Sequence, residues 1–116
     1  MTATDTLQVR AMDKPDDTQE FPLVKIQATA IGGMQIIRIV AQPGWRWSTS
    51  VGPVVGATSC PAPHTGYIVR GTLHLRMDDG TESELVAGDA FTCAAGHDGW
   101  VVGSEPLEFL EVAPAG

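Results

Sequence analysis

Positive charge is scarce in this sequence. Seven Lys and Arg residues stand against fourteen Asp and Glu residues, which gives a formal net charge of −7 at pH 7. A surface of this sign repels phosphate backbones, and the sequence contains no cluster of Lys or Arg that would offer a local exception. We therefore expect no nucleic-acid partner.

Long apolar runs and cysteines are also rare. No stretch approaches the roughly 18 consecutive apolar residues of a membrane helix, and the opening Met-Thr-Ala-Thr-Asp-Thr lacks the basic and apolar regions of a signal peptide. We expect no membrane association and a cytoplasmic location. The two cysteines, Cys60 and Cys93, are then expected to be thiols or metal ligands, because a reducing compartment disfavours a disulfide.

Several motifs of common enzyme classes are missing. The sequence has no Gly-rich phosphate loop between a strand and a helix, and no serine in a nucleophile elbow. Hydrolase and kinase activities are therefore without support.

The composition indicates one all-β domain. The 116 residues are 43% hydrophobic, enough to bury a core, and 13 Gly and 8 Pro residues predict many turns. Residues 1–20 are rich in acidic groups and poor in large apolar ones, so little burial could offset the entropy lost on ordering them. We predict a flexible acidic N-terminal arm at 1–20 and a single domain at 21–116.

Alternating apolar and polar residues predict a series of strands and no long helix. Gly32-Gly33 and Asp79-Gly80 suit the two-residue turns of β-hairpins, because these residues tolerate positive φ. The predicted strands cover 24–30, 34–41, 72–77, 82–86, 90–93, 100–102 and 107–112. The strand at 34–41 is apolar on nearly both faces, which predicts cover from the protein interior and from outside.

The spacing of glycines and candidate ligands resembles that of the cupin superfamily. Its first motif places His-x-His, then Glu, and then Gly after six further residues. Counting back from Gly71, His64 occupies the Glu position, Cys60 the second His position and Thr58 the first.

The second cupin motif is matched more loosely. Gly88 is followed after five residues by Ala94-Ala95-Gly96, where the family has Pro-x-Gly. The next ligand position is Gly99, and His97 lies two residues before it. The resemblance covers Pro43–Val112 and implies an all-β, cupin-type jelly-roll β-barrel, commonly a homodimer.

The resemblance implies a divalent transition metal, such as zinc, iron, nickel, copper or manganese. Its candidate ligands are His64, Cys60 and His97, since imidazole and thiolate are good donors for such ions. For each residue a second interpretation stays open. His64 could be a hydrogen-bonded pocket histidine and Cys60 a small buried residue, while His97 sits in a predicted turn from which it could face solvent. Cys93 is expected to pack in the core.

Aromatic residues predict a ligand pocket at the barrel mouth. Trp45 and Trp47 would face one side of an extended segment and form either core or pocket wall. Tyr67 could donate a hydrogen bond near a metal or simply pack. The predicted lining is Trp45, Trp47, Tyr67, Phe91 and Trp100.

Two functions follow from these expectations. The first is a metal-binding cupin that acts on a compact organic acid or aromatic, as an oxygenase, isomerase or lyase. The second is a metal-free binding or sensor module with an apolar, tryptophan-lined pocket. The degenerate ligand motif leaves both open.

Overall fold

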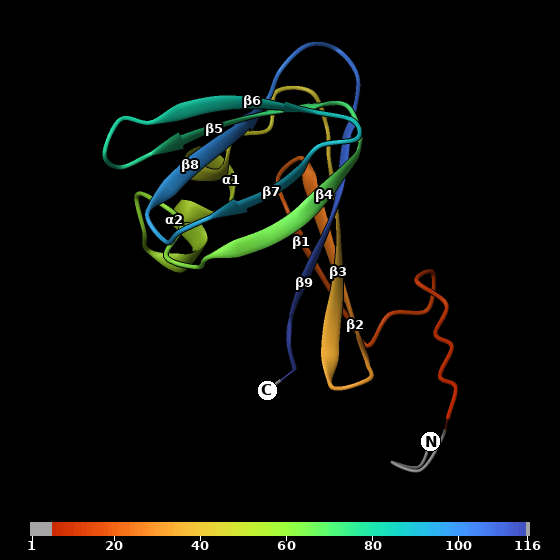
Figure 1. The fold of residues 1–116 in the computed structure, drawn as a ribbon. Helices are drawn as coiled ribbons and strands as arrows, with labels where there is room; N and C mark the ends of the chain where they lie inside the picture. The colour runs from red at the N-terminus through yellow and green to blue at the C-terminus, as the bar shows by residue number, and fades with distance from the viewer. Residues whose placement is uncertain (1–5, 116) are drawn as a thin grey trace.

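The computed structural model describes residues 6–115 and contains two antiparallel sheets (Figure 1). The larger sheet has six strands in the order β1-β2-β3-β9-β4-β7. These strands are β1 (Asp17–Phe21), β2 (Val24–Ile31), β3 (Met34–Ala41), β9 (Leu107–Pro114), β4 (His64–Arg70) and β7 (Ala90–Cys93). The fold class is therefore the predicted all-β jelly roll.

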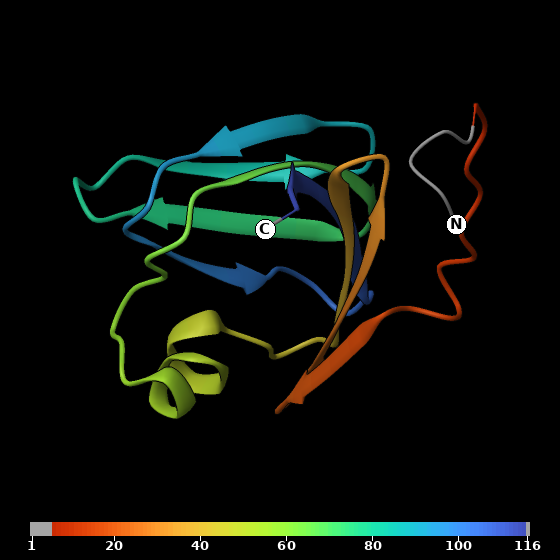
Figure 2. The ribbon, with the colours of Figure 1, turned by 90° about the horizontal axis from the view of Figure 1, so that it is seen from below.

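The second sheet has three strands in the order β6-β5-β8. They are β6 (Glu82–Val86), β5 (Thr72–Met77) and β8 (His97–Val101). Two one-turn helices, α1 (Trp47–Ser50) and α2 (Gly52–Val55), lie to one side of the sheets, away from the tip of the β2–β3 hairpin (Figures 1 and 2).

The hydrophobic core lies between the two sheets. Its largest fully buried apolar residues are Ile68 on β4 and Leu107 on β9. Leu73 and Leu85 contribute from the smaller sheet, and both are almost fully buried. The alternation seen in the sequence thus directs one face of each sheet inward.

The predicted hairpins are present. β2 pairs with β3 around Gly32 and Gly33, which have φ of 57° and 77°. β5 pairs with β6 through a three-residue turn instead of the predicted two-residue one, because the Met77 N–H donates to the Thr81 carbonyl at 2.7 Å. Gly80, the last residue of this turn, has φ of 92°. These backbone conformations cost little only in glycine, which explains how local turn residues specified the pairing.

Two predictions on segment boundaries differ from the structure. β1 begins at Asp17 and pairs with β2, so the sheet starts within the predicted arm at 1–20. Residues 1–5 of that arm lie outside the described part of the chain. The segment around the two tryptophans is not extended throughout, because Trp47 begins α1.

The two helices are fixed by local and tertiary contacts. Pro53 lies in the first turn of α2, and Gly56 ends that helix with φ of 73°. The Asp98 carboxylate on β8 accepts the Ser48 backbone N–H at 3.0 Å and pairs with Arg46 Nε at 2.8 Å. Asp98 therefore attaches α1 to the smaller sheet.

Within residues 6–115, no helix is long and apolar enough to cross a membrane.

Candidate metal centre

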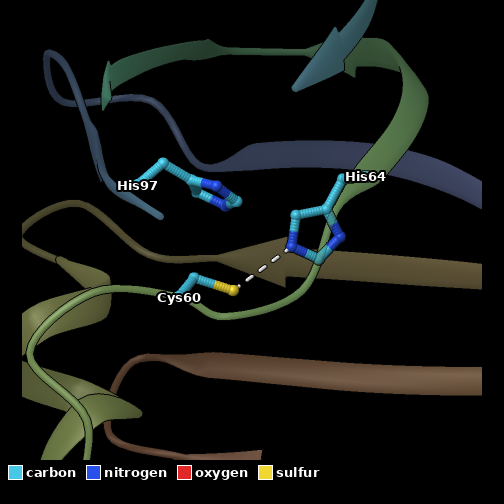
Figure 3. Close-up of side chains that lie close together, drawn as sticks. All are labelled: Cys60, His64 and His97. Atoms are coloured by element: carbon cyan, nitrogen blue, oxygen red, sulfur yellow. Dashed lines mark hydrogen bonds between the residues drawn. The ribbon is translucent and has the colours of Figure 1, made fainter. Parts of the chain in front are cut away.

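Three potential metal donors converge inside the fold. One donor atom each of Cys60, His64 and His97 lies within 4.8 Å of the other two. The Cys60 Sγ is 3.4 Å from His64 Nε2, and the two imidazole centroids are 5.1 Å apart at an interplanar angle of 71°. Figure 3 shows the thiol and the two rings directed toward a common point. The sequence pattern had named these three residues as candidate ligands.

Backbone pairing brings the donors together. His64 is the first residue of β4 and His97 the first of β8. The Cys60 N–H donates to the His97 carbonyl at 2.7 Å, and the Gly96 N–H donates to the Cys60 carbonyl at 2.7 Å. The prediction of a turn at His97 is wrong, because pairing with Met77 and Cys60 places it in a strand. Of the two directions left open for its side chain, the structure shows the inward one, since His97 is only 4% exposed.

Each histidine has its Nδ1 held by an acceptor. His64 Nδ1 contacts the carboxylate of Glu111, which is itself buried. His97 Nδ1 donates to the Ala94 carbonyl at 2.8 Å. Contacts of this kind fix the ring orientation and the tautomer, and they leave Nε2 available as a ligand atom.

The electrostatics of the cluster favour a thiolate at Cys60. Burial opposes its ionisation, but hydrogen bonds with His64 and His97 outweigh burial and lower its pKa from 9.0 to about 6. Burial also disfavours the His64 imidazolium, yet contacts with Cys60 and Glu111 raise its pKa from 6.5 to about 9. The hydrogen bond with Cys60 raises the pKa of His97. Thiolate, the form of Cys that binds metals, is therefore accessible at neutral pH.

The donor cluster faces a small cavity between the two sheets. The cavity holds about 100 Å³ and is mainly apolar. A larger depression of about 650 Å³ lies on the outer surface over β1, β2 and β3, but the three donors do not line it, so we place the site in the smaller cavity. The cavity is lined by Val24, Ile26, Ile39, Trp45, Trp47, Val51, Cys60, His64, Leu73, Leu75, Phe91, Cys93, His97, Gly99, Phe109 and Glu111.

The predicted aromatic lining divides into two groups. Trp45, Trp47 and Phe91 line the cavity. Tyr67 on β4 does not line the cavity and is 48% exposed. Trp100 also lies outside the lining, because its ring stacks on His74 with centroids 4.5 Å apart and on the Arg46 guanidinium at 4.4 Å. β8 turns alternate residues to opposite faces, so Trp100 cannot face inward with Gly99.

Two polar residues of the cavity were not anticipated. Glu111 follows Leu107 and Phe109 at a spacing of two, so alternation along the last strand could have placed its carboxylate on the inner face. Cys93 was expected in the core, but it lines the cavity with its Sγ 3.8 Å from His97 Nδ1. Burial raises the pKa of its thiol. Both Cys60 and Cys93 are free thiols.

The donor set fits a divalent transition metal. One thiolate and two imidazoles are ligands of zinc, iron, copper and nickel, whereas manganese prefers oxygen. Three protein ligands match reactive metal sites, which keep one position open for water or substrate. The held Nδ1 atoms supply the outer contacts that such histidines generally make.

Solved structures of other proteins share the fold described above. No family model matches this sequence, and the curated proteins gave no match either. Among solved structures, the polyketide cyclase RemF from Streptomyces resistomycificus aligns with a TM-score of 0.64 at 17% identity, over 94% of this chain and 80% of that one. KdgF from Halomonas sp. aligns with a TM-score of 0.61 at 18% identity, covering 86% and 87%.

A third similar structure is named as a cupin domain. The Cupin_2 domain of an XRE family transcriptional regulator from Enterobacter cloacae aligns with a TM-score of 0.60 at 14% identity, over 81% of this chain and 98% of that one. The likeness to these structures is one of fold.

Proposed function

We propose that this cupin-fold protein binds a divalent transition metal through Cys60, His64 and His97, and that it presents the metal to a small organic molecule in the adjoining cavity. One observation carries the proposal: the Nδ1 atoms of both histidines are already held, by Glu111 and by the Ala94 carbonyl. The remaining donors are therefore oriented before a metal arrives, which lowers the cost of binding it.

The ligand chemistry favours zinc or ferrous iron over manganese. A thiolate is a soft donor, and together with two imidazoles it suits zinc, iron, copper or nickel. Because Cys60 must be a thiolate and both Nε2 atoms must be unprotonated, binding should release protons. The low pKa of Cys60 reduces the cost of that release for the thiol.

A bound divalent ion would supply Lewis acidity at its open position. The reaction classes we propose are those of an oxygenase, an isomerase or a lyase. Some structural neighbours are named as enzymes, a polyketide cyclase among them, which supports catalysis as an activity that this scaffold can host. The fold alone does not assign a reaction, since one scaffold serves many chemistries.

A second candidate function is a metal-free binding or sensor module. The observation that favours it is the apolar wall of the cavity, to which four aromatic and six aliphatic side chains contribute, against five polar or titratable groups. Such a cavity can hold a small molecule without a metal. Direct measurement of metal content separates the two functions.

We also propose that the protein acts as a homodimer in the cytoplasm. Met34, Tyr67 and Val112 are 39%, 48% and 44% exposed on β3, β4 and β9. β9 pairs with both β3 and β4, and Val112 lies opposite Ile36, so these side chains belong to neighbouring strands of one sheet. An exposed apolar face of this kind suits a second copy of the chain. The two free thiols agree with a reducing compartment.

Metal content tests the main proposal. The protein is stripped with a chelator, loaded with zinc or cobalt, freed of excess metal and analysed by elemental mass spectrometry. We expect one equivalent per chain and, with cobalt, a thiolate-to-metal charge-transfer absorption. Cys60→Ser should remove that absorption, and His64→Ala should lower the metal content.

Two control variants each remove a thiol or an imidazole that is not one of the three proposed metal ligands. Cys93→Ser removes the other cysteine, and His74→Ala removes a histidine that stacks on Trp100 outside the cavity. Both should bind metal as the unmodified protein does. The metal proposal would be refuted if the unmodified protein bound less than about 0.2 equivalents of metal. It would also be refuted if Cys60→Ser and His64→Ala bound as much metal as the unmodified protein.

A further inference from the structure

The cavity beside the donor cluster is too small for the body of an organic substrate. It holds about 100 Å³, whereas sites that enclose small molecules usually measure about 300–1,000 Å³. A bound metal ion would also take up part of this space. The cavity therefore has room for a water molecule or for one small functional group, and the rest of a substrate must lie elsewhere.

A groove of suitable size adjoins the cavity. It measures about 320 Å³ and is lined by residues of β5, β6 and β7. β6 is the strand at which the smaller sheet ends, and β7 is the strand at which the larger sheet ends (Figure 1). Leu75, Phe91 and Cys93 line both the groove and the cavity. The two hollows therefore meet at these three side chains.

The donor cluster can be reached from the side of the groove. Cys93 is the smallest of the three shared side chains, and it is only half-buried. His64 lies directly opposite Cys93 in the β4–β7 pair, and its side chain keeps 25% exposure. The Cys93 Sγ is also 3.8 Å from the His97 ring. A small group that enters past Cys93 therefore arrives beside two of the three proposed metal ligands.

The inner surface of the groove is apolar. Leu85 on β6 is 6% exposed, and residues two apart along a strand point to the same face. Ser83 therefore shares the inner face with Leu85, and it lies opposite Leu75 in the β5–β6 pair. Met77 and Phe91 add apolar side chains from β5 and β7. Such a surface favours an apolar ligand.

The carboxylates along the groove have other partners. Glu82 Oε1 is 2.8 Å from His74 Nε2, and Glu84 Oε2 is 3.8 Å from Nδ1 of the same ring. The Asp89 carboxylate accepts the Val86 N–H at 2.8 Å. Among the described residues that line the groove there is no Lys, Arg or His. Apolar contact, rather than pairing with a charge, therefore sets the preference of the groove.

We propose that the groove binds the body of the substrate, and that only a small donor group of the substrate passes Cys93 into the cavity to reach the metal. The substrate class is then a compound that carries one small oxygen, nitrogen or sulfur donor at the end of an uncharged, apolar chain. The inference rests on the metal-dependent function proposed above, and it adds the place and the chemistry of the ligand.

A series of thiols tests the apolar contacts of the groove. Ethanethiol, butanethiol and hexanethiol carry the same small sulfur donor, which suits the proposed metals, on chains of increasing length. Their binding to the cobalt-loaded protein is followed without oxygen by the change in cobalt absorption. Burial of each methylene group tightens binding by up to about fourfold, so we expect hexanethiol to bind at least about tenfold more tightly than ethanethiol.

Two tryptophan variants of β6 locate the effect. Ser83→Trp places a large ring on the inner face, so the advantage of hexanethiol over ethanethiol should fall below about threefold, while the affinity for ethanethiol should be unchanged. Glu84→Trp places the same ring on the outer face beside His74 and should keep the full advantage. Amide NMR spectra show whether each variant keeps its fold.

A probe without a metal-binding sulfur tests the groove in the chelator-stripped protein. 1-Hexanol has the same chain as hexanethiol, so it should change the amide chemical shifts of β6 and β7 in the unmodified protein and in Glu84→Trp. The same addition should change them little in Ser83→Trp. Ethanol at equal concentration should have little effect, because it lacks the apolar chain.

The outcomes distinguish this inference from the metal proposal. If cobalt binds and the three thiols bind equally well, or if Ser83→Trp keeps the advantage of hexanethiol, the groove is not the substrate site while the metal site stands. If no metal binds but 1-hexanol changes the shifts of β6 and β7 as expected, the groove stands as a ligand site and the metal proposal fails. If no metal binds and 1-hexanol leaves these strands unchanged, both proposals are wrong.

Discussion

Cys60 and His97 are joined through their backbones as well as through their side chains. The Cys60 N–H donates to the His97 carbonyl at 2.7 Å, and the neighbouring Gly96 N–H donates to the Cys60 carbonyl at the same distance. This isolated bridge fixes the segment before β4 against the start of β8. Two donor side chains that are distant in the sequence are thereby held on one side of the cavity before a metal binds.

The turn before His97 depends on Gly96. This residue has φ of 88°, and a Cβ added there would lie 2.7 Å from the Asp78 Oδ2. Gly96→Ala should lower the free energy of unfolding by about 1–2 kcal/mol for the backbone strain, with a further loss from crowding. It should also weaken metal binding, because the turn carries His97.

Gly103→Ala is the matched control for Gly96→Ala. Gly103 also has φ of 88°, but an added Cβ would meet nothing within 4 Å. Chemical denaturation should therefore show a smaller loss of stability in Gly103→Ala, and its metal affinity should be unchanged. Equal metal affinity in both variants would contradict a role for the Gly96 turn in positioning His97.

Glu111 should act as a positioning residue for His64. Its carboxylate contacts the His64 Nδ1, and it lies on β9 rather than among the three donors. Glu111→Gln should therefore reduce metal affinity about 10- to 100-fold, as expected for loss of a carboxylate behind a ligating histidine. Competition with a chromogenic chelator measures the affinity.

Glu108→Gln controls for the removal of a carboxylate from the same strand. Glu108 pairs with Arg38 and Arg70 instead of a histidine of the site. Its replacement should leave metal affinity unchanged. A Glu111→Gln protein that binds metal as tightly as Glu108→Gln would show that His64 is oriented without the carboxylate.

The Cys60 thiol should ionise near pH 6 in the metal-free protein. Its pKa is lowered to about 6, so the thiolate absorbance in the ultraviolet should rise as the pH passes upward through that value. His64→Ala removes a hydrogen bond that lowers the pKa, so the rise should move to higher pH. In Cys93→Ser the step should persist, since burial raises the pKa of the Cys93 thiol away from this range.

A titration with no step below pH 8 in the unmodified protein would contradict the thiolate assignment. A step that persists in Cys60→Ser would assign it to another group.

The apolar face of the larger sheet should mediate dimerisation. Val112→Lys introduces a charge at an exposed position of β9, where burial against a second copy would be costly. Light scattering coupled to size-exclusion chromatography should report a dimer for the unmodified protein and a monomer for this variant. Val86→Lys, at a 48% exposed position on β6 in the other sheet, should remain dimeric. A monomeric unmodified protein would refute the proposed assembly.

Local sequence determined most of the strands and their turns, but the predicted set lacks β1 and β4 and starts β8 three residues late. Alternation from Thr72 to Met77, ended by Asp79-Gly80, predicts a hairpin, because side-chain direction and positive φ are properties of a few neighbouring residues. Glycine spacing and the resemblance it carries also predicted the jelly roll and named Cys60, His64 and His97. These features depend on patterns among residues that are close together in the chain, so they can be read directly from the sequence.

The tertiary structure alone decided what surrounds those donors. Glu111 reaches His64 because β9 pairs beside β4, and Trp100 turns outward onto His74 because β8 pairs with β5. His97 lies in a strand rather than a turn since Cys60 and Met77 supply its backbone partners. Such contacts join residues far apart in the chain, and their geometry follows from strand order and register, which no local pattern specifies.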